Sequence, residues 1–558
     1  MSRLSVPIHG KMIPVEVSLL PTCTADDALI REETLNLLSA GRYILRDGPV
    51  DFSSSILLSQ SAKSVAVVDV DDSLPSGVSF WQGDFRVHTY RLSHEGAEQE
   101  MIDGAGEEEE IAACDQWILP AASLEGVWES LVLEQGVKSH LLEYATSALL
   151  FTDKGVSKNV ISWNRVVLLH GPPGTGKTSL CKALAHKLTI RLGARYSSGQ
   201  LLEINAHSLF SKWFSESGKL VQRLFEHILE LADDEDSLVC VLVDEVESLT
   251  AARSAAMGGN EPSDAVRVVN AVLTQIDNLR ERDNVLVLTT SNVSEAIDLA
   301  FVDRADIKQY IGLPTAPARY QVLISCLEEL VRVGIVESPF CLPPSFSKAV
   351  EFTTAASEGV RLSTASSSAA TATPPPETSA TGPGEAGGGG GVGGGGADDG
   401  GRVGGRGSTA EPQRREQESH GSSSPIVLEG GSGGDASGRS VMTTSSSGNG
   451  GSSRRNTLDS GGDVVMDTAL DVGEVGVGRD GGDPPRVRTG LHAAAEDLVN
   501  IARLAEGLSG RALRKLPLQA HARYVQRPSC TISEFLSAMT RAVHKELGDR
   551  RSLETHRL

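Results

Sequence analysis

A short apolar run, a glycine-rich loop and a helical pattern follow one another between Arg165 and Lys187. The run 166–170 (VVLLH) is suited to a strand that is buried on both faces of a parallel sheet. The loop reads GPPGTGKT, which fits the pattern G-x-x-x-x-G-K-[ST], and leucine and alanine then recur on one helical face. This order predicts an α/β domain built around a phosphate-binding loop.

The residue types of this loop suit a nucleoside triphosphate. Gly174 and Gly176 let backbone N–H groups approach phosphate oxygens closely. Lys177 can reach the β- and γ-phosphates, Thr178 can offer its hydroxyl to Mg²⁺, and the helix N-terminus adds a favourable dipole. The predicted nucleotide-binding residues are Gly171, Pro172, Pro173, Gly174, Thr175, Gly176, Lys177 and Thr178.

Two carboxylates end a second apolar run. Residues 239–243 (VCVLV) predict a buried strand, and Asp244 and Glu245 follow it directly. A buried parallel strand has no use for charge at its tip unless a cation or a proton transfer is located there. We therefore expect Asp244 to hold Mg²⁺ together with Thr178, and Glu245 to polarise the attacking water.

Three further polar residues stand at the ends of predicted elements. Asn292 follows the next apolar strand and is either a turn residue or a group that orients the water. Arg304 ends a short helix and is either a surface ion-pair partner or an arginine finger for a neighbouring subunit. Arg511 lies in the first turn of a helix that begins at Ser509 or Gly510, and is either a surface residue or a sensor of the phosphates.

Trp213 and Phe214 lie in a polar, serine-rich stretch, residues 211–219. Two large aromatic residues beside a lysine are unusual in a core segment, where neighbours would be apolar. We expect either that the pair caps a helix against the sheet, or that it belongs to an exposed loop whose rings grip another polypeptide.

The composition disfavours several classes of protein. A formal charge of −22 over 558 residues argues against a general nucleic-acid binder, because phosphate backbones select clustered lysine and arginine. The seven cysteines show no C-x-x-C pair and no metal-type spacing, which is typical of a reduced, intracellular protein. No apolar run approaches the roughly twenty residues of a membrane span, and the N-terminus lacks a signal-peptide core. We expect no direct binding to nucleic acid or membrane.

One stretch of the chain is too poor in apolar residues to fold. No aromatic residue lies between Phe352 and Tyr524, and residues 353–490 hold 34 of the 58 glycines. Such a sequence cannot bury enough apolar surface to offset its conformational entropy. The predicted segments are an N-terminal α+β binding domain (1–110), a helical linker (111–150), the large α/β domain (151–314), the first part of a small helical domain (315–351), a disordered Gly/Ser-rich insertion (352–490), the second part of the helical domain (491–547) and a tail (548–558).

In this order the motifs resemble those of AAA+ ATPases. The Walker A loop corresponds to 171–178, Walker B to Asp244 and Glu245, sensor 1 to Asn292, the arginine finger to Arg304 and sensor 2 to Arg511. The segments LFSKWFSESGKLV, EPSDAVRVVNAVLTQID and EGLSGRALRKLP are similar to the pachytene checkpoint protein 2 family, of the thyroid-receptor-interacting protein type. The resemblance implies a P-loop NTPase with a parallel sheet, a C-terminal helical lid and a separate N-terminal α+β domain.

The same resemblance implies an activity. Members are expected to be homohexamers that hydrolyse ATP with Mg²⁺ to convert or unfold HORMA-domain proteins, with a HORMA-type adaptor engaged at the N-terminal domain. Trp213 and Phe214 fall on the substrate-gripping pore loop. The implied roles are in the mitotic spindle checkpoint and in meiotic chromosome-axis remodelling, recombination and synapsis. The implied locations are the nucleus and chromosomes, with the cytoplasm and kinetochore in addition.

The chain departs from many AAA+ relatives at the arginine finger. Asp303 stands before Arg304, where those relatives have paired arginines, so Arg267 and Arg253 remain alternative trans-acting residues.

Two rival interpretations remain. The first is an AAA+ enzyme that severs or disassembles other protein complexes. If it severed tubulin, a microtubule-binding module and a basic linker would be expected before residue 111, and that region is not basic. The second is a non-catalytic, nucleotide-gated scaffold. It would be expected to lose Lys177 or Glu245, and both are present.

Overall fold

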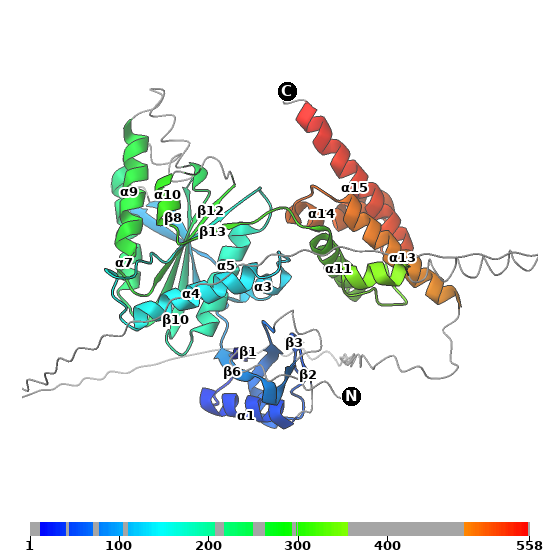
Figure 1. Ribbon diagram of the computed structural model, residues 1–558, viewed down its shortest axis with the longest axis horizontal. Helices are drawn as coiled ribbons and strands as arrows, with labels where there is room; N and C mark the ends of the chain where they lie inside the picture. The colour runs from blue at the N-terminus through cyan, green and yellow to red at the C-terminus, as the bar shows by residue number, and fades with distance from the viewer. Residues whose placement is uncertain are drawn as a thin grey trace, which may run out of the picture. The chain divides into compact units, whose positions relative to one another are not determined.

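The computed structural model of the chain describes residues 12–40, 44–70, 78–103, 110–206, 217–248, 263–292, 297, 299–354 and 485–555. These residues form an N-terminal domain, a central α/β domain and a helical lid (Figure 1). Among the described helices, none is long and apolar enough to cross a membrane.

A seven-stranded sheet forms the middle layer of the central domain, in the order β13–β9–β12–β11–β10–β8–β7. The first five of these strands run parallel to one another. They are β9 (Val166–His170), β10 (Ser198–Asn205), β11 (Ser237–Asp244), β12 (Val285–Ser291) and β13 (Ile307–Tyr310). Next to them, β8 (Glu110–Leu119) pairs antiparallel with β10, and β7 (Glu98–Asp103) pairs antiparallel with β8.

Strand β8 differs from the sequence expectation. The sequence predicts a helical linker over 111–150, whereas the first part of that segment is a strand of the central sheet. Trp117 and Leu119 are buried while Ile118 between them is 43% exposed, which is the period-two pattern of a strand with one buried face. The backbone of β10 supplies its hydrogen-bond partners, and β7, from within the predicted N-terminal domain 1–110, pairs on its other side.

The helical patterns later in the same segment are confirmed. They form α3 (Val127–Ser130) and α4 (Val137–Asp153).

Helices cover both faces of the sheet, so its parallel strands are buried on both sides (Figure 1). Helices α4 and α5 (Lys177–Arg191) pack on one face, and α7 (Ser217–Ala232) and α9 (Ser263–Leu279) pack on the other. Within β9, Val166 and Leu168 join the core beneath α7 and α9, while Val167 and Leu169 join the core beneath α5. This two-sided burial explains the uninterrupted apolar run of that strand.

The lid folds from two segments of sequence. Its elements are α11 (Ala316–Arg332), β14 (Val336–Glu337), α13 (Pro485–Leu504), α14 (Gly510–Ala520), a π-helical turn η4 (His521–Val525), β15 (Cys530–Thr531) and α15 (Ile532–Thr555). One core joins Leu323 of α11 to Leu498 of α13 and Phe535 of α15, and β14 pairs with β15. The predicted insertion, 352–490, lies largely outside the described residues. The segments before and after this insertion pack together into one domain.

The N-terminal domain has a four-stranded sheet in the order β3–β4–β1–β6 and a second, two-stranded pair, β2 with β5. The strands are β1 (Met12–Leu19), β2 (Ile44–Leu45), β3 (Gly48–Pro49), β4 (Ala62–Val67), β5 (Val78–Ser79) and β6 (Asp84–Tyr90), and the helices are α1 (Asp27–Ala40) and α2 (Ile56–Ser61). Val15 and Val17 of β1 pack with Ile30 of α1 and Leu58 of α2. The predicted α+β domain is confirmed.

Buried ion pairs join β1 of the N-terminal domain to α5. Glu16 is 6% exposed, and its two carboxylate oxygens accept from Lys187 Nζ (2.8 Å) and Arg191 Nε (3.1 Å). Lys187 also donates to Glu129 (2.8 Å), and Arg191 donates to Asp69. Burial alone would lower the pKa of Lys187, but the charges of Glu16 and Glu129 outweigh it and the pKa is raised. The N-terminal domain thus rests on the helix that begins at the phosphate-binding loop.

Glu16→Ala should lower the free energy of unfolding by about 3 kcal/mol, because it leaves two buried cations without their shared carboxylate. The matched control is Glu125→Ala, which breaks the exposed pair between Glu125 and Lys63 (2.7 Å) and should cost about 0.5 kcal/mol or less. Urea denaturation checks both values. Equal losses in the two variants would contradict the role assigned to the buried network.

Candidate nucleotide site

The loop between β9 and α5 adopts backbone conformations that favour glycine. Gly171 has φ +143° and Gly174 has φ +75°. A Cβ at Gly171 would lie 2.2 Å from the carbonyl oxygen of Ile311, so this position also needs glycine for space. The loop therefore packs closely against the chain that leaves β13.

Lys177 is the first residue of α5 and is buried. Its Nζ donates to the carbonyl oxygens of Gly171 and Pro172 (both 2.9 Å) and to Oδ1 of Asn292 (2.8 Å). Burial lowers the pKa of Lys177; the carboxylates of Glu247 and Asp244 oppose that shift, and the guanidinium of Arg511 adds to it. The ammonium is thus held at the mouth of the loop, where a phosphate can replace the loop carbonyls as its partner.

Hydroxyl and carboxylate oxygens gather beside this ammonium. Thr178 Oγ1 donates to Asp244, at 3.0 Å from Oδ1 and 3.2 Å from Oδ2. The Thr290 hydroxyl donates to the same Oδ1 of Asp244. Oxygen donors of this kind are the ligands that hard divalent cations prefer, and the pair Thr178–Asp244 fits such an ion.

Glu245 lies beyond the end of β11 with φ +60°, an uncommon conformation for a residue with a side chain. Its backbone N–H donates to the Thr290 hydroxyl at 3.3 Å. Asn292 follows β12, which lies between β9 and β11 in the sheet. The order of the strands therefore brings Lys177, Asn292 and the Asp244–Glu245 pair to one edge of the sheet.

The lid touches the loop directly. Ser509 caps α14 by accepting from the backbone of Ala512, which confirms the predicted helix start. The backbone N–H of Arg511 donates to the carbonyl oxygen of Gly174 at 3.1 Å. Arg511 thus contacts the phosphate-binding loop, and its charge contributes to the lowered pKa of Lys177.

A small, partly apolar cavity of about 40 Å³ adjoins the loop and the lid. Its walls include Thr175 of the loop, Ile311 and Pro314 after β13, Ala318 of α11 and Val132 before α4. Its position next to the phosphate loop suits the base of a nucleotide.

Of the other predicted residues, the structure describes Arg304 and Arg267. Arg304 ends α10 (Leu299–Arg304) and is ion-paired with Asp277 of α9 at 2.7 Å. Arg267 is an exposed residue of α9. Trp213, Phe214 and Arg253 lie outside the described residues.

Sequence reasoning missed two residues that the structure places at the site, Thr290 and Glu247, and also Asp277, which binds Arg304. The Thr290 hydroxyl hydrogen-bonds both Asp244 and the backbone of Glu245. The charge of Glu247 acts to raise the pKa of Lys177. A signal existed for both, because Thr290 lies near the end of a predicted strand and Glu247 follows Glu245 by two residues. Asp277 gave no local signal, since its partner Arg304 is distant in sequence.

Comparison with known proteins finds three matching families along the chain. The family "ATPase family associated with various cellular activities (AAA)" matches residues 167–313, the "TRIP13 N-terminal domain" matches 10–95, and the "TRIP13-like, AAA+ ATPase lid C-terminal domain" matches 485–547. The chain is 54% identical over 326 residues to the pachytene checkpoint protein 2 homolog of Gallus gallus and 53% identical over 328 residues to that of Homo sapiens, in each case over 58% of this chain and 75% of the relative.

The chain belongs to the pachytene checkpoint protein 2 family. The predicted family is therefore confirmed, and so is the predicted AAA+ fold with a lid and a separate N-terminal domain. The solved structure of C. elegans PCH-2 is similar with a TM-score of 0.57 and 26% identity, over 96% of this chain and all of that one. This member of the pachytene checkpoint protein 2 family is an ATPase, as the sequence predicts.

Gly174→Ala should weaken ATP binding about tenfold, because the added methyl would lie 2.9 Å from Ser509 Oγ and 3.3 Å from Arg511 Cβ and would push α14 away. Gly126→Ala is the matched control. Gly126 has the same φ of +75°, but nothing lies within 4 Å of its added Cβ. Titration with a fluorescent ATP analogue measures both affinities. Equal weakening would assign the effect to something other than contact with the lid.

Proposed function

We propose that this chain is a homohexameric motor that uses ATP and Mg²⁺ to convert or unfold HORMA-domain proteins. A HORMA-type adaptor presents the client at the N-terminal domain, and Trp213 and Phe214 grip it in the pore. The biological roles are inactivation of the mitotic spindle checkpoint and remodelling of meiotic chromosome axes, with control of recombination and synapsis. The nucleus and chromosomes, together with the cytoplasm and kinetochore, are the proposed locations.

The single observation that carries this proposal is that three domain models of this family match along one chain. Sequences typical of the family's N-terminal domain, ATPase domain and lid all occur, in order. Lys177, Asp244 and Glu245, the residues proposed for hydrolysis, are all present. A scaffold that only binds nucleotide has no need of Glu245 beside Asp244. An N-terminal domain of this family's type favours a HORMA-protein remodeller over an enzyme that severs other assemblies.

The described residues have distinct parts in hydrolysis. Bound ATP with Mg²⁺ supplies the scissile phosphate and neutralises part of its charge. Lys177 and the loop amides bind the phosphates, and Thr178 and Asp244 are the residues that would bind Mg²⁺. Glu245 accepts the proton of the attacking water, and Asn292 orients that water. Arg304 completes the site of the neighbouring subunit, and Arg511 links the phosphates to the lid.

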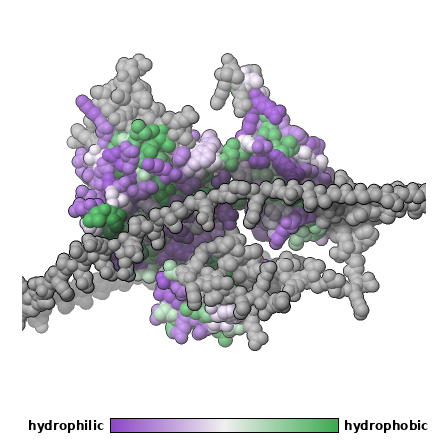
Figure 2. Space-filling view, viewed as in Figure 1, coloured by the Kyte–Doolittle hydropathy of each residue, from purple (hydrophilic) through white to green (hydrophobic). Residues whose placement is uncertain are grey.

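An exposed apolar group supports the proposed self-association. Leu150 and Phe151 of α4, and Val160 and Ile161 beyond it, all have exposed side chains, with Val160 reaching 83%. Figure 2 shows hydrophobic groups among mainly hydrophilic residues on the visible face of the central domain. Apolar side chains that gather on a surface are typical of contacts between proteins.

Val160→Asp should raise the protein concentration needed for assembly about tenfold, because a charge would be buried at the subunit contact. Ile56→Asp is the control, since Ile56 is 76% exposed but belongs to the N-terminal domain. Mass photometry across a dilution series measures assembly. If both variants assemble like the unchanged chain, the contact lies elsewhere.

The proposed activity predicts that a closed HORMA-domain protein with its adaptor increases the rate of ATP hydrolysis. Glu245→Gln should bind ATP and retain the client but lose turnover by about 10³-fold, because the base for the attacking water is gone. Trp213→Ala should keep basal hydrolysis and lose remodelling. The measurements are steady-state ATPase rates and client conversion, with and without client.

Three results would count against this proposal. Basal hydrolysis that ignores the HORMA client and its adaptor would leave an ATPase with another substrate. The scaffold interpretation would return if the unchanged protein did not hydrolyse ATP. Normal client conversion by Trp213→Ala would remove the pore-loop assignment.

A further inference from the structure

The guanidinium of Arg304 is held along one edge. Its Nε donates to Asp277 Oδ1 (3.0 Å) and its Nη2 to Asp277 Oδ2 (2.7 Å), which is a side-on, bidentate pair. Its Nη1 donates to the carbonyl oxygen of Ala300 (2.8 Å), one turn earlier in α10. These contacts, within the described part of the chain, use three of the five N–H donors of Arg304. One N–H remains on each terminal nitrogen, which matches the two-point grip of an arginine on a phosphate.

Asp277 is itself held in one orientation. Its Oδ1 also accepts from Arg280 Nη1 at 3.2 Å, one turn further along the chain. Burial would raise the pKa of the Asp277 carboxyl, but the hydrogen bonds and charges of Arg304 and Arg280 outweigh burial and lower it. The side chains of Arg304 and Asp277 remain 25% and 37% exposed. A pair with that exposure adds little to folding stability, so its main consequence is the orientation of Arg304.

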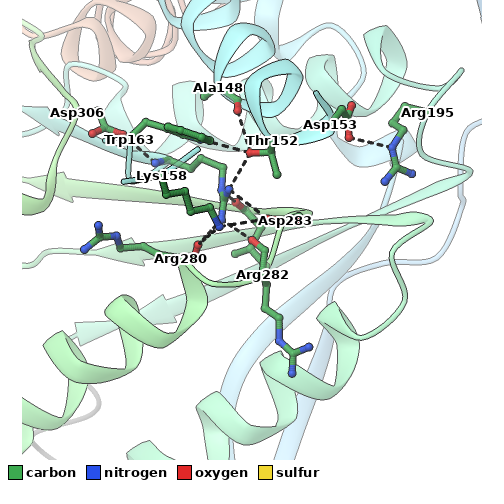
Figure 3. A network of polar contacts seen from close by, with 12 residues as sticks. Ala148, Thr152, Asp153, Lys158, Trp163, Arg195, Arg280, Arg282, Asp283 and Asp306 are labelled. Atoms are coloured by element: carbon green, nitrogen blue, oxygen red, sulfur yellow. Dashed lines mark hydrogen bonds and ion pairs between the residues drawn. The ribbon is translucent and has the colours of Figure 1, made fainter. Parts of the chain in front are cut away.

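One short segment before β9 anchors both partners. The buried Arg165 side chain donates to the carbonyl oxygens of Arg280 (2.6 Å), Arg282 and Val285 (3.0 Å), which fixes the end of α9. Figure 3 shows Arg280 and Arg282 within this network of polar contacts. The neighbouring Asn164 side chain donates to the carbonyl oxygen of Arg304 at 2.9 Å.

The same segment also holds the chain directly after α10. Asp306 Oδ2 accepts from the backbone N–H groups of Asn164 (2.7 Å) and Arg165 (2.8 Å), and from the Tyr144 hydroxyl. Asp277 and Arg304, on different helices, are therefore placed by a common rigid support.

We propose that Asp277 is a positioning residue that aims the open edge of Arg304 at the γ-phosphate of ATP bound by the neighbouring subunit. This inference rests on the proposed role of Arg304 in trans. Arginine is most effective when its fork is already oriented toward the charge that develops in the transition state. Without Asp277, Arg304 keeps its charge but loses the contact that fixes two of its nitrogens.

The test compares Asp277→Ala and Arg304→Ala in the full-length assembled chain, with kcat and KM for ATP measured separately. Arg304→Ala should lower kcat about 10³-fold. Asp277→Ala should lower kcat roughly 10- to 100-fold with KM changed about twofold or less, because a misaimed group costs transition-state stabilisation and not nucleotide binding. Asp277→Asn keeps an acceptor oxygen and should fall between Asp277→Ala and the unchanged chain.

The control is Glu329→Ala. Glu329 makes a comparable bidentate pair with Arg332 at 2.7 and 2.8 Å, but that pair is exposed on the lid. Its loss should leave kcat unchanged.

Two further readouts separate positioning from general damage. Adding Asp277→Ala to Arg304→Ala should cause no further loss, because Asp277 acts through Arg304. Mixed assemblies of Asp277→Ala with Glu245→Gln subunits should regain hydrolysis. In them an intact Arg304 from a Glu245→Gln neighbour faces the intact site of an Asp277→Ala subunit. A further loss in the double variant, or no recovery on mixing, would overturn the proposal.

The outcomes also separate this inference from the function on which it rests. Normal kcat in Asp277→Ala with a large loss in Arg304→Ala would overturn the positioning role and leave the arginine finger intact. Normal kcat in Arg304→Ala would overturn the finger and the positioning role together. Hydrolysis that responds to a HORMA client is a separate measurement and bears on neither result.

Discussion

The ammonium group of Lys177 is the charge around which the rest of the site is arranged. A buried cation is tolerated only where acceptors surround it, and here they come from its own loop and from Asn292 beyond β12. Those acceptors meet only because β12 lies between β9 and β11 in the sheet. The same order brings Asp244 to Thr178, and the lid completes the enclosure through the Arg511 contact with Gly174. The order of the strands in the sheet therefore determines the geometry of the site.

Helix α5 connects this site to the N-terminal domain. Its first residue is Lys177, and its last turns carry Lys187 and Arg191, which share the buried carboxylate of Glu16. Buried ion pairs are costly unless their geometry is satisfied on all sides, so they favour one arrangement over near alternatives. The segment Asn164–Arg165, directly before β9, also makes contacts that link separate elements. Arg165 donates to the backbone that follows α9, and Asn164 donates to the backbone of Arg304.

The elements that sequence predicted best carry their signal locally. The apolar run of β9, the glycines of its loop and the Ser509 cap of α14 each follow from neighbouring residues. Strand β8 was wrongly expected to be helical, because its pairing with β10 depends on a partner distant in sequence. Asp277 was missed for the same reason. The pore-loop residues Trp213 and Phe214 lie outside the described residues and stay a prediction.

By itself, the sequence determined the chemistry of this protein: a phosphate loop, two carboxylates after an apolar strand, and a lid interrupted by a glycine-rich stretch. Those features are short-range, since each is read from residue types within a few positions. Only the tertiary structure decided which groups meet. Asn292 bonds Lys177, Arg511 stands on Gly174, and Asp277 holds one edge of Arg304. Such pairs depend on strand order and helix packing, which arise from burial summed over the whole chain and leave no local mark.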